Sequence, residues 1–137
     1  MKTGLFYAGI AGLTGVMLGA FGAHALKEIL TTRDSLGIWE TAVFYQLTHA
    51  VAALGVNLFA QTHPSGNRKW MSRASTYWLI GIGLFSGSLY LLALGGPRWI
   101  GPVTPLGGLF LMSGWVCLLV EACHTKPASQ TLTHHDR

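Results

Sequence analysis

Four long apolar stretches, joined by short polar connections, constrain this chain more than any other feature. They occupy residues 4–26, 36–60, 74–94 and 105–123. A helix needs roughly 20 residues to cross the hydrocarbon core of a bilayer, and each stretch is long enough to do so. Only 10% of the 137 residues are charged, against about a quarter in an ordinary soluble domain. The pattern predicts an all-α polytopic membrane protein, an antiparallel four-transmembrane-helix bundle.

The four stretches form a single domain over residues 1–124, and the polar segment 125–137 is predicted to be a disordered cytoplasmic tail. Local chemistry supports the helix ends. Asp34 and Ser35 suit the cap of the second helix, the Gly-Gly-Pro of 95–97 ends the third, and the Thr-Pro of 104–105 opens the fourth. Indole rings favour the headgroup layer, where we expect the tryptophans near the run ends: Trp39, Trp70, Trp78 and Trp99.

The basic residues divide unevenly between the two sides of such a bundle. One side carries Lys2, Arg68, Lys69, Arg73, Lys126 and Arg137. The other carries Lys27, Arg33 and Arg98, accompanied by Glu28 and Asp34. The positive-inside rule therefore predicts a multi-pass protein of the cell inner (plasma) membrane, with both termini cytoplasmic. The net charge of +4 then serves topology, and no nucleic-acid partner is expected.

The first stretch has a competing interpretation. Lys2, the apolar run and the Ala-His-Ala of 23–25 resemble a secretory signal with its cleavage site. The run is longer than the roughly 7–15 apolar residues of a usual signal, and its glycines recur at helical spacing. We therefore favour a retained first helix over a cleaved signal.

Small residues predict where the helices approach one another. In the first stretch they lie along one helix face: Ala8, Gly12, Gly15, Gly19 and Gly22. In the third stretch, Gly83, Gly87 and Tyr90 predict another close-contact line, with Ser86 beside it. The two thiols, Cys117 and Cys123, are expected to be packing residues, because six residues of helix place them too far apart for a disulfide.

The second stretch carries polar residues near its centre, within "AVFYQLTHAVAALGV" at 42–56. At about 100° per residue, one face collects Ala42, Gln46, His49, Ala53 and Asn57. The opposite face collects Phe44, Leu47, Val51, Leu54 and Leu58. Because lipid offers no hydrogen-bond partners, we expect the polar face to turn inward.

An antiparallel hairpin of the first two stretches sets the depths of their residues. His24 then lies level with Glu40, and we expect the two to interact by a hydrogen bond, directly or through water. Gln46 lies level with Met17 and Leu18. His24 and His49 are about 13 Å apart along the axis in this arrangement, so a shared metal or haem is not expected.

Four motifs resemble one known family. They are "GAFGAHAL" at 19–26, "YQLTH" at 45–49, "LFSGSLYLLAL" at 84–94 and "VTPLGG" at 103–108. The chain thereby resembles the domain of unknown function 423 family, which contains YgdD-like small integral membrane proteins and a eukaryotic transmembrane relative. The resemblance implies a four-helix membrane protein and supplies no reaction. It places the family's polar signature on His24, Tyr45, Gln46, His49, Ser86, Ser88, Tyr90 and Thr104.

Two functions compete for the polar cluster, and neither is enzymatic, since no catalytic or cofactor-binding motif is present. The favoured one is an accessory, assembly or structural component of the inner membrane, within a larger membrane protein complex or a homo-oligomer. The alternative is proton or small-molecule (quinone, lipid or polar solute) binding or transport. The candidate intramembrane residues are His24, Glu40, Tyr45, Gln46, His49, Ser86 and Tyr90. No metal or cofactor is expected, and the lipid bilayer is an expected partner.

Overall fold

The computed structural model describes residues 2–62 and 69–124, so the predicted tail at 125–137 lies outside the described residues. Four helices are long and apolar enough to cross a membrane, which confirms the predicted fold class. They are α1 (Lys2–Ala23), α3 (Leu36–Thr62), α4 (Lys69–Ala93) and α5 (Val103–His124). Two short elements join them at one end of the bundle: α2 (Lys27–Thr32) and the 3-10 turn η1 (Arg98–Ile100).

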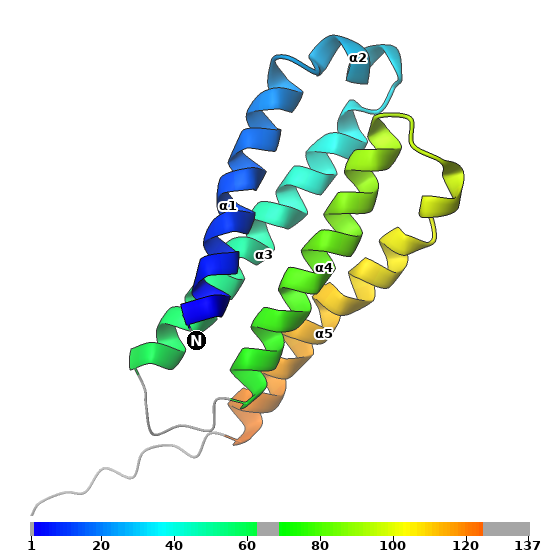
Figure 1. Cartoon of the computed structure of the whole chain (residues 1–137). Helices are drawn as coiled ribbons and strands as arrows, with labels where there is room; N and C mark the ends of the chain where they lie inside the picture. The colour runs from blue at the N-terminus through cyan, green and yellow to red at the C-terminus, as the bar shows by residue number, and fades with distance from the viewer. Residues whose placement is uncertain (1, 63–68, 125–137) are drawn as a thin grey trace, which may run out of the picture.

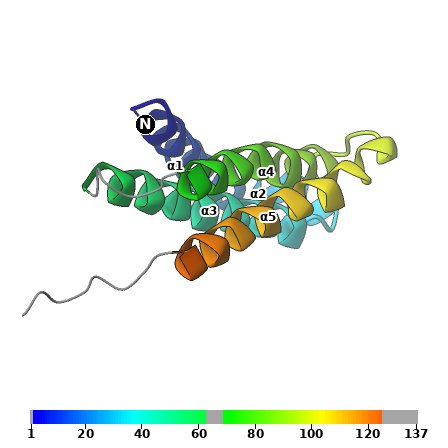
Figure 2. The ribbon, with the colours of Figure 1, turned by 90° about the horizontal axis from the view of Figure 1, so that it is seen from below.

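The helices alternate in direction, so α1 and α4 begin at the end of the bundle where α3 and α5 finish (Figure 1). The second view shows α1 and α5 on opposite sides of a central pair formed by α3 and α4 (Figure 2). The main packing contacts are therefore those of α1 with α3, α3 with α4, and α4 with α5. This arrangement leaves lateral grooves beside the central pair.

The connection after α1 differs from the prediction, because the first helix ends at Ala23 and a separate helix, α2, follows. Asp34 ends α2 with a left-handed backbone (φ 52°), and the amide of Ser35 bonds back to the carbonyl of Leu30 at 2.9 Å. This is the Schellman ending, which glycine, asparagine and aspartate accept. Instead of acting as a cap for α3, the Ser35 hydroxyl donates to the carbonyl of Ala93 at 2.8 Å, which ties the end of α4 to this connection.

The end of α4 also has a left-handed residue, and the start of α5 uses a side chain to contact another helix. Gly95 has a φ of 87°, and the amide of Gly96 bonds to the carbonyl of Leu91 at 2.8 Å. The predicted stop of the third helix is thus confirmed. The fourth helix opens at Val103, and the hydroxyl of Thr104 bonds to that of Ser88 at 2.7 Å instead of serving as the cap. The same threonine therefore joins α5 to α4.

The contact between α1 and α3 uses some of the predicted small residues and omits one. A Cβ at Gly15 would meet Leu47 at 2.7 Å, and a Cβ at Gly22 would meet the indole of Trp39. Gly12 has no atom within 4 Å of such a Cβ, so its predicted place in the contact is wrong. Ala11, one position earlier, is buried instead. The predicted contact face of α1 is therefore shifted by one residue at this point, which corresponds to a rotation of about 100° around the helix axis.

The contact between α4 and α5 also differs from the prediction. A Cβ at Gly83 or Gly87 would meet nothing within 4 Å, so the close-contact line predicted through them is wrong. The close approach occurs at Gly81 and Gly107, where an added Cβ would meet Leu111 and the backbone of Phe85, respectively. Gly114 makes room for the indole of Trp78 in the same way. Bulk on one helix is therefore matched by glycine on the other.

Two of the tryptophans expected in the headgroup layer lie inside the bundle. Trp78 is fully buried, and its indole N–H donates to the carbonyl of Leu111 at 3.1 Å. Trp39 is buried as well and donates to the carbonyl of Leu18 at 2.9 Å. By contrast, Trp99 in η1 is 74% exposed, as an interfacial ring should be. The prediction for these two indoles was wrong because a residue near the end of an apolar stretch can still lie on the face of the helix that points into the bundle.

Replacing Gly114 with alanine is expected to destabilise the protein by about 1–3 kcal/mol, because the new methyl group overlaps Trp78 and overpacks the core. Gly87→Ala is the matched control, since its methyl group enters open space on the same pair of helices. Reversible unfolding in mixed detergent measures both changes. Equal stability of the two variants would contradict the assigned α4–α5 contact.

Candidate functional site

Gln46 lies at the centre of the polar cluster and connects three helices. Its side chain is 4% exposed. The amide nitrogen donates to the carbonyl of Ala11 at 2.8 Å and to the hydroxyl of Thr14 at 2.9 Å, both on α1. The amide oxygen accepts the Tyr90 hydroxyl of α4 at 2.9 Å. Gln46 thus uses both halves of its amide to join α3 to α1 and α4.

The inward orientation predicted for this face of α3 is confirmed, since Ala42, Gln46, His49, Ala53 and Asn57 are all buried. The predicted depth is less accurate. Gln46 lies against Gly15 and bonds to Ala11 and Thr14, two to seven positions before the expected Met17 and Leu18. A helical carbonyl points toward the C-terminus, so a donor reaches the carbonyl of a residue that lies about a turn earlier in the chain.

His49 is held by two hydrogen bonds of opposite sense. Its Nδ1 lies 2.8 Å from the carbonyl of Tyr45, one turn earlier in α3. Its Nε2 accepts the indole N–H of Trp115 in α5 at 3.2 Å. Because a carbonyl only accepts and an indole only donates, both contacts fit the neutral imidazole with its hydrogen on Nδ1. Trp115 was not predicted, although an indole in mid-run has one N–H that needs an acceptor.

Tyr45 has a different environment from that of the two buried residues. It is 37% exposed, and its ring lies over His49 with centroids 5.8 Å apart and against Phe85 at 4.6 Å. These rings line a lateral groove of about 380 Å³ between α3 and α5. The groove brings Tyr45, His49 and Trp115 together on a face that looks toward lipid.

Tyr90 and Ser86 were predicted to reinforce the cluster from α4. Tyr90 does so through its bond to Gln46, and its ring packs on Trp39 with centroids 4.6 Å apart. Ser86 is 1% exposed, yet its hydroxyl finds no hydrogen-bond partner within the described part of the chain. Ser86 therefore lies beside the cluster without joining its hydrogen bonds.

His24 and Glu40 were predicted to form a pair at the outer end of the first hairpin. Both side chains are exposed, and over residues 2–62 and 69–124 no direct hydrogen bond or ion pair joins them. His24 lies in the turn that separates α1 from α2, whereas Glu40 lines a surface hollow with Gly22, Lys27 and Trp39. Ala23, the residue before His24, lines the same hollow as Glu40, so the predicted depth is nearly met while the direct hydrogen bond is not formed.

Two further polar contacts join neighbouring helices, one on each side of Gln46 along the bundle axis. Asn57 of α3 donates to the hydroxyl of Ser75 in α4 at 2.7 Å. At the other end, Ser88 and Thr104 join α4 to α5. The described residues contain no group of three His, Cys, Asp or Glu side chains placed to hold a metal ion. The arrangement as a whole holds helices together through hydrogen bonds at several depths.

Comparison with known proteins agrees with this architecture. The family model described as "Protein of unknown function (DUF423)" matches residues 18–108. A UPF0382 membrane protein of Staphylococcus saprophyticus is 38% identical over 122 residues, covering 88% of this chain and 96% of that protein. The UPF0382 inner membrane protein YgdD of Escherichia coli K12 is 39% identical over 122 residues, covering 89% and 90%. No solved structure matches the chain.

Gln46→Leu should lower the free energy of unfolding by about 2 kcal/mol, because it removes three interhelical hydrogen bonds of about 0.6 kcal/mol each. Tyr90→Phe removes one of the three and should cost about a third as much. Phe44→Ala, on the lipid-facing side of the same helix, is the control. A Gln46→Leu protein as stable as the wild type would show that these bonds do not hold the helices together.

Proposed function

Since the chain belongs to the DUF423 family of integral membrane proteins, we propose that it is a non-enzymatic accessory, assembly or structural component of the inner membrane. One observation carries the proposal: the buried side chains of Gln46 and His49 are both engaged in hydrogen bonds that reach other helices. Gln46 bonds to α1 and α4, and both ring nitrogens of His49 have partners.

A proton carrier or ligand site needs polar atoms that are free to exchange partners. In His49, a second ring proton on Nε2 would point at the indole N–H of Trp115, so that two donors would oppose each other. In Gln46, a ligand would have to displace Tyr90, Thr14 or the carbonyl of Ala11. Both residues are therefore better suited to positioning helices than to handling a proton or a small molecule.

A second candidate function, small-molecule binding, has one observation in its favour. The groove of Tyr45, His49 and Trp115 opens sideways between α3 and α5 and is lined by aromatic rings. A planar aromatic head such as a quinone would fit such walls. Such a ligand would leave Gln46 in place and would contact His49 and Trp115, which both line the groove.

Replacing His49 with glutamine separates the two candidates, because an amide keeps one donor and one acceptor while losing the imidazole. With the accessory role, tagged His49→Gln protein purified in mild detergent should retain its co-purifying membrane protein, or a second copy, within about twofold of wild type. His49→Leu, which keeps neither bond, is the matched variant and should be less stable. Mass spectrometry of the eluted complexes measures the partners and any bound small molecule.

The opposite outcome is equally clear. A folded His49→Gln protein that loses a co-eluting quinone or other small molecule would contradict the accessory role. That result would favour the second candidate.

The distribution of basic residues supports an orientation with both termini cytoplasmic. The two ends of the bundle differ in the described residues: Cys123 is exposed near the end of α5, and α2 lies at the opposite end (Figure 1). In intact cells, a membrane-impermeant maleimide should label a cysteine introduced by Thr31→Cys, with both native cysteines changed to alanine. It should not label native Cys123. Labelling in the reverse pattern would invert the proposed topology.

A further inference from the structure

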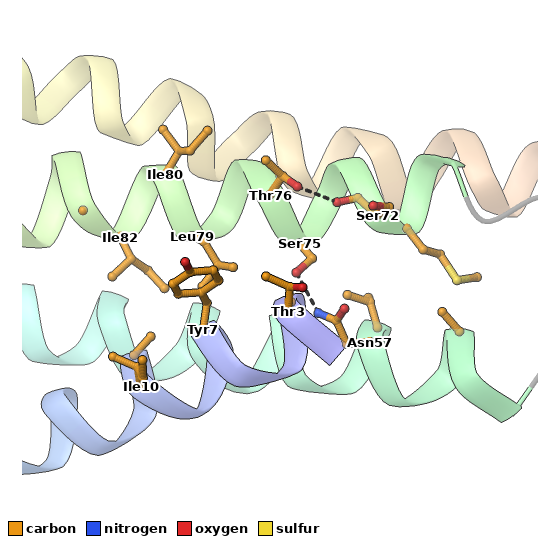
Figure 3. Close-up of a pocket in the computed structure, with 16 residues that line it drawn as sticks. Thr3, Tyr7, Ile10, Asn57, Ser72, Ser75, Thr76, Leu79, Ile80 and Ile82 are labelled. Carbon is orange, nitrogen blue, oxygen red and sulfur yellow. Dashed lines mark hydrogen bonds between the residues drawn. The ribbon is translucent and has the colours of Figure 1, made fainter. Parts of the chain in front are cut away.

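A second groove, separate from the Tyr45–His49–Trp115 groove, lies where α1 leans away from α4. It has a volume of about 760 Å³, and its walls come from α1, α3 and α4 (Figure 3). It lies toward the end of the bundle at which α1 and α4 begin and α3 finishes. Because the helices span the bilayer, this groove opens sideways into the hydrocarbon.

The groove changes from polar to apolar along its length. Its polar end, within the first two turns of α1 and α4, carries Thr3, Asn57, Ser72, Ser75 and Thr76. Its apolar end, nearer the middle of the bundle, carries Ile10, Leu79, Ile80, Ile82 and Gly83. From Ser72 to Gly83 the α4 wall extends about 16 Å. A molecule that fits both ends has a polar group near the interface and a long apolar chain.

Asn57 places a hydrogen-bond acceptor at the polar end of the groove. Its side chain is 8% exposed, and its amide nitrogen donates to the carbonyl of Ala53 and to the hydroxyl of Ser75 (Figure 3). In the described ranges its carbonyl oxygen accepts no hydrogen bond from another residue. The oxygen is not among the enclosed polar atoms of the described residues that lack a partner, and Asn57 lines the groove, so the oxygen is accessible from it. A ligand hydroxyl or ammonium group would satisfy this oxygen.

We propose that this groove binds one glycerophospholipid, with its glycerol and headgroup at Asn57 and Ser75 and an acyl chain along Ile10, Leu79 and Ile82. The depth supports this occupant. α4 has 25 residues, somewhat more than the bilayer core requires, so Ser72 to Thr76 lie close to the level of the lipid glycerol groups. A water-soluble metabolite would place polar atoms against the apolar walls of the groove. A phospholipid in the bilayer, by contrast, already has its polar group at this depth and its acyl chains parallel to the helices.

Gly83 and Gly87 provide a matched test, since neither glycine has an atom within 4 Å of an added Cβ and only Gly83 lines the groove. The wild-type protein and the variants Gly83→Leu and Gly87→Leu are reconstituted with phosphatidylethanolamine and phosphatidylglycerol and released for native mass spectrometry. The wild type and Gly87→Leu should carry one phospholipid per chain. Gly83→Leu, whose side chain occupies the acyl-chain position, should bind it about tenfold more weakly.

A smaller change, Gly83→Ala, covers the case in which leucine disturbs folding, and it should give an intermediate loss at unchanged helicity. Equal phospholipid retention by the Gly83 and Gly87 variants would overturn the proposal. So would a wild-type protein whose groove is covered by a second copy, seen as a dimer that Gly83→Leu dissociates. Equal phospholipid retention leaves the accessory role untouched, because that role depends on Gln46 and His49 and not on this groove.

Discussion

The bundle depends on one recurrent interaction, in which a side-chain N–H of one helix reaches a backbone carbonyl of its neighbour past a glycine. Gln46 reaches Ala11 beside Gly15, Trp39 reaches Leu18 beside Gly22, and Trp78 reaches Leu111 beside Gly114. In each case the glycine lies three or four residues after the carbonyl, where a side chain would normally cover it. Because glycine has no Cβ, the backbone carbonyl is open to a donor from the neighbouring helix. In a lipid-exposed helix, such a carbonyl accepts only the hydrogen bond within its own helix.

This interaction explains why polar residues are retained inside a membrane bundle. Lipid tails are as apolar as leucine, so apolar packing alone provides little preference for one helix arrangement over another. A donor that must meet one particular carbonyl fixes both the rotation and the depth of a helix. Gln46 does this for α1 and α4 together, and Trp115 extends the constraint to α5 through His49.

The same contacts shape the surfaces on which function depends. α1 is drawn toward α3 by Gln46 and Trp39, and α5 is drawn toward α4 by Trp78, so neither outer helix covers the central pair completely (Figure 2). The two lateral grooves follow from this arrangement. One is walled by aromatic rings at mid-bundle, and the other grades from polar to apolar near the helix ends. A tightly closed bundle of the same helices would have neither groove.

The four spans, the stop at Gly95, and the inward face of Gln46, His49 and Asn57 could be predicted from the amino-acid sequence, because each depends on local chemistry or on helical periodicity. Helix packing sets which glycines make contact, buries Trp78, and brings Gln46 to Ala11 and Thr14. Periodicity alone could not predict these contacts, because it defines a helix face only to within one residue, about 100° of rotation. Crossing angle and relative depth arise when two helices meet. The separate helix α2 was missed for the same reason, since the path of a short connection depends on the helices it joins.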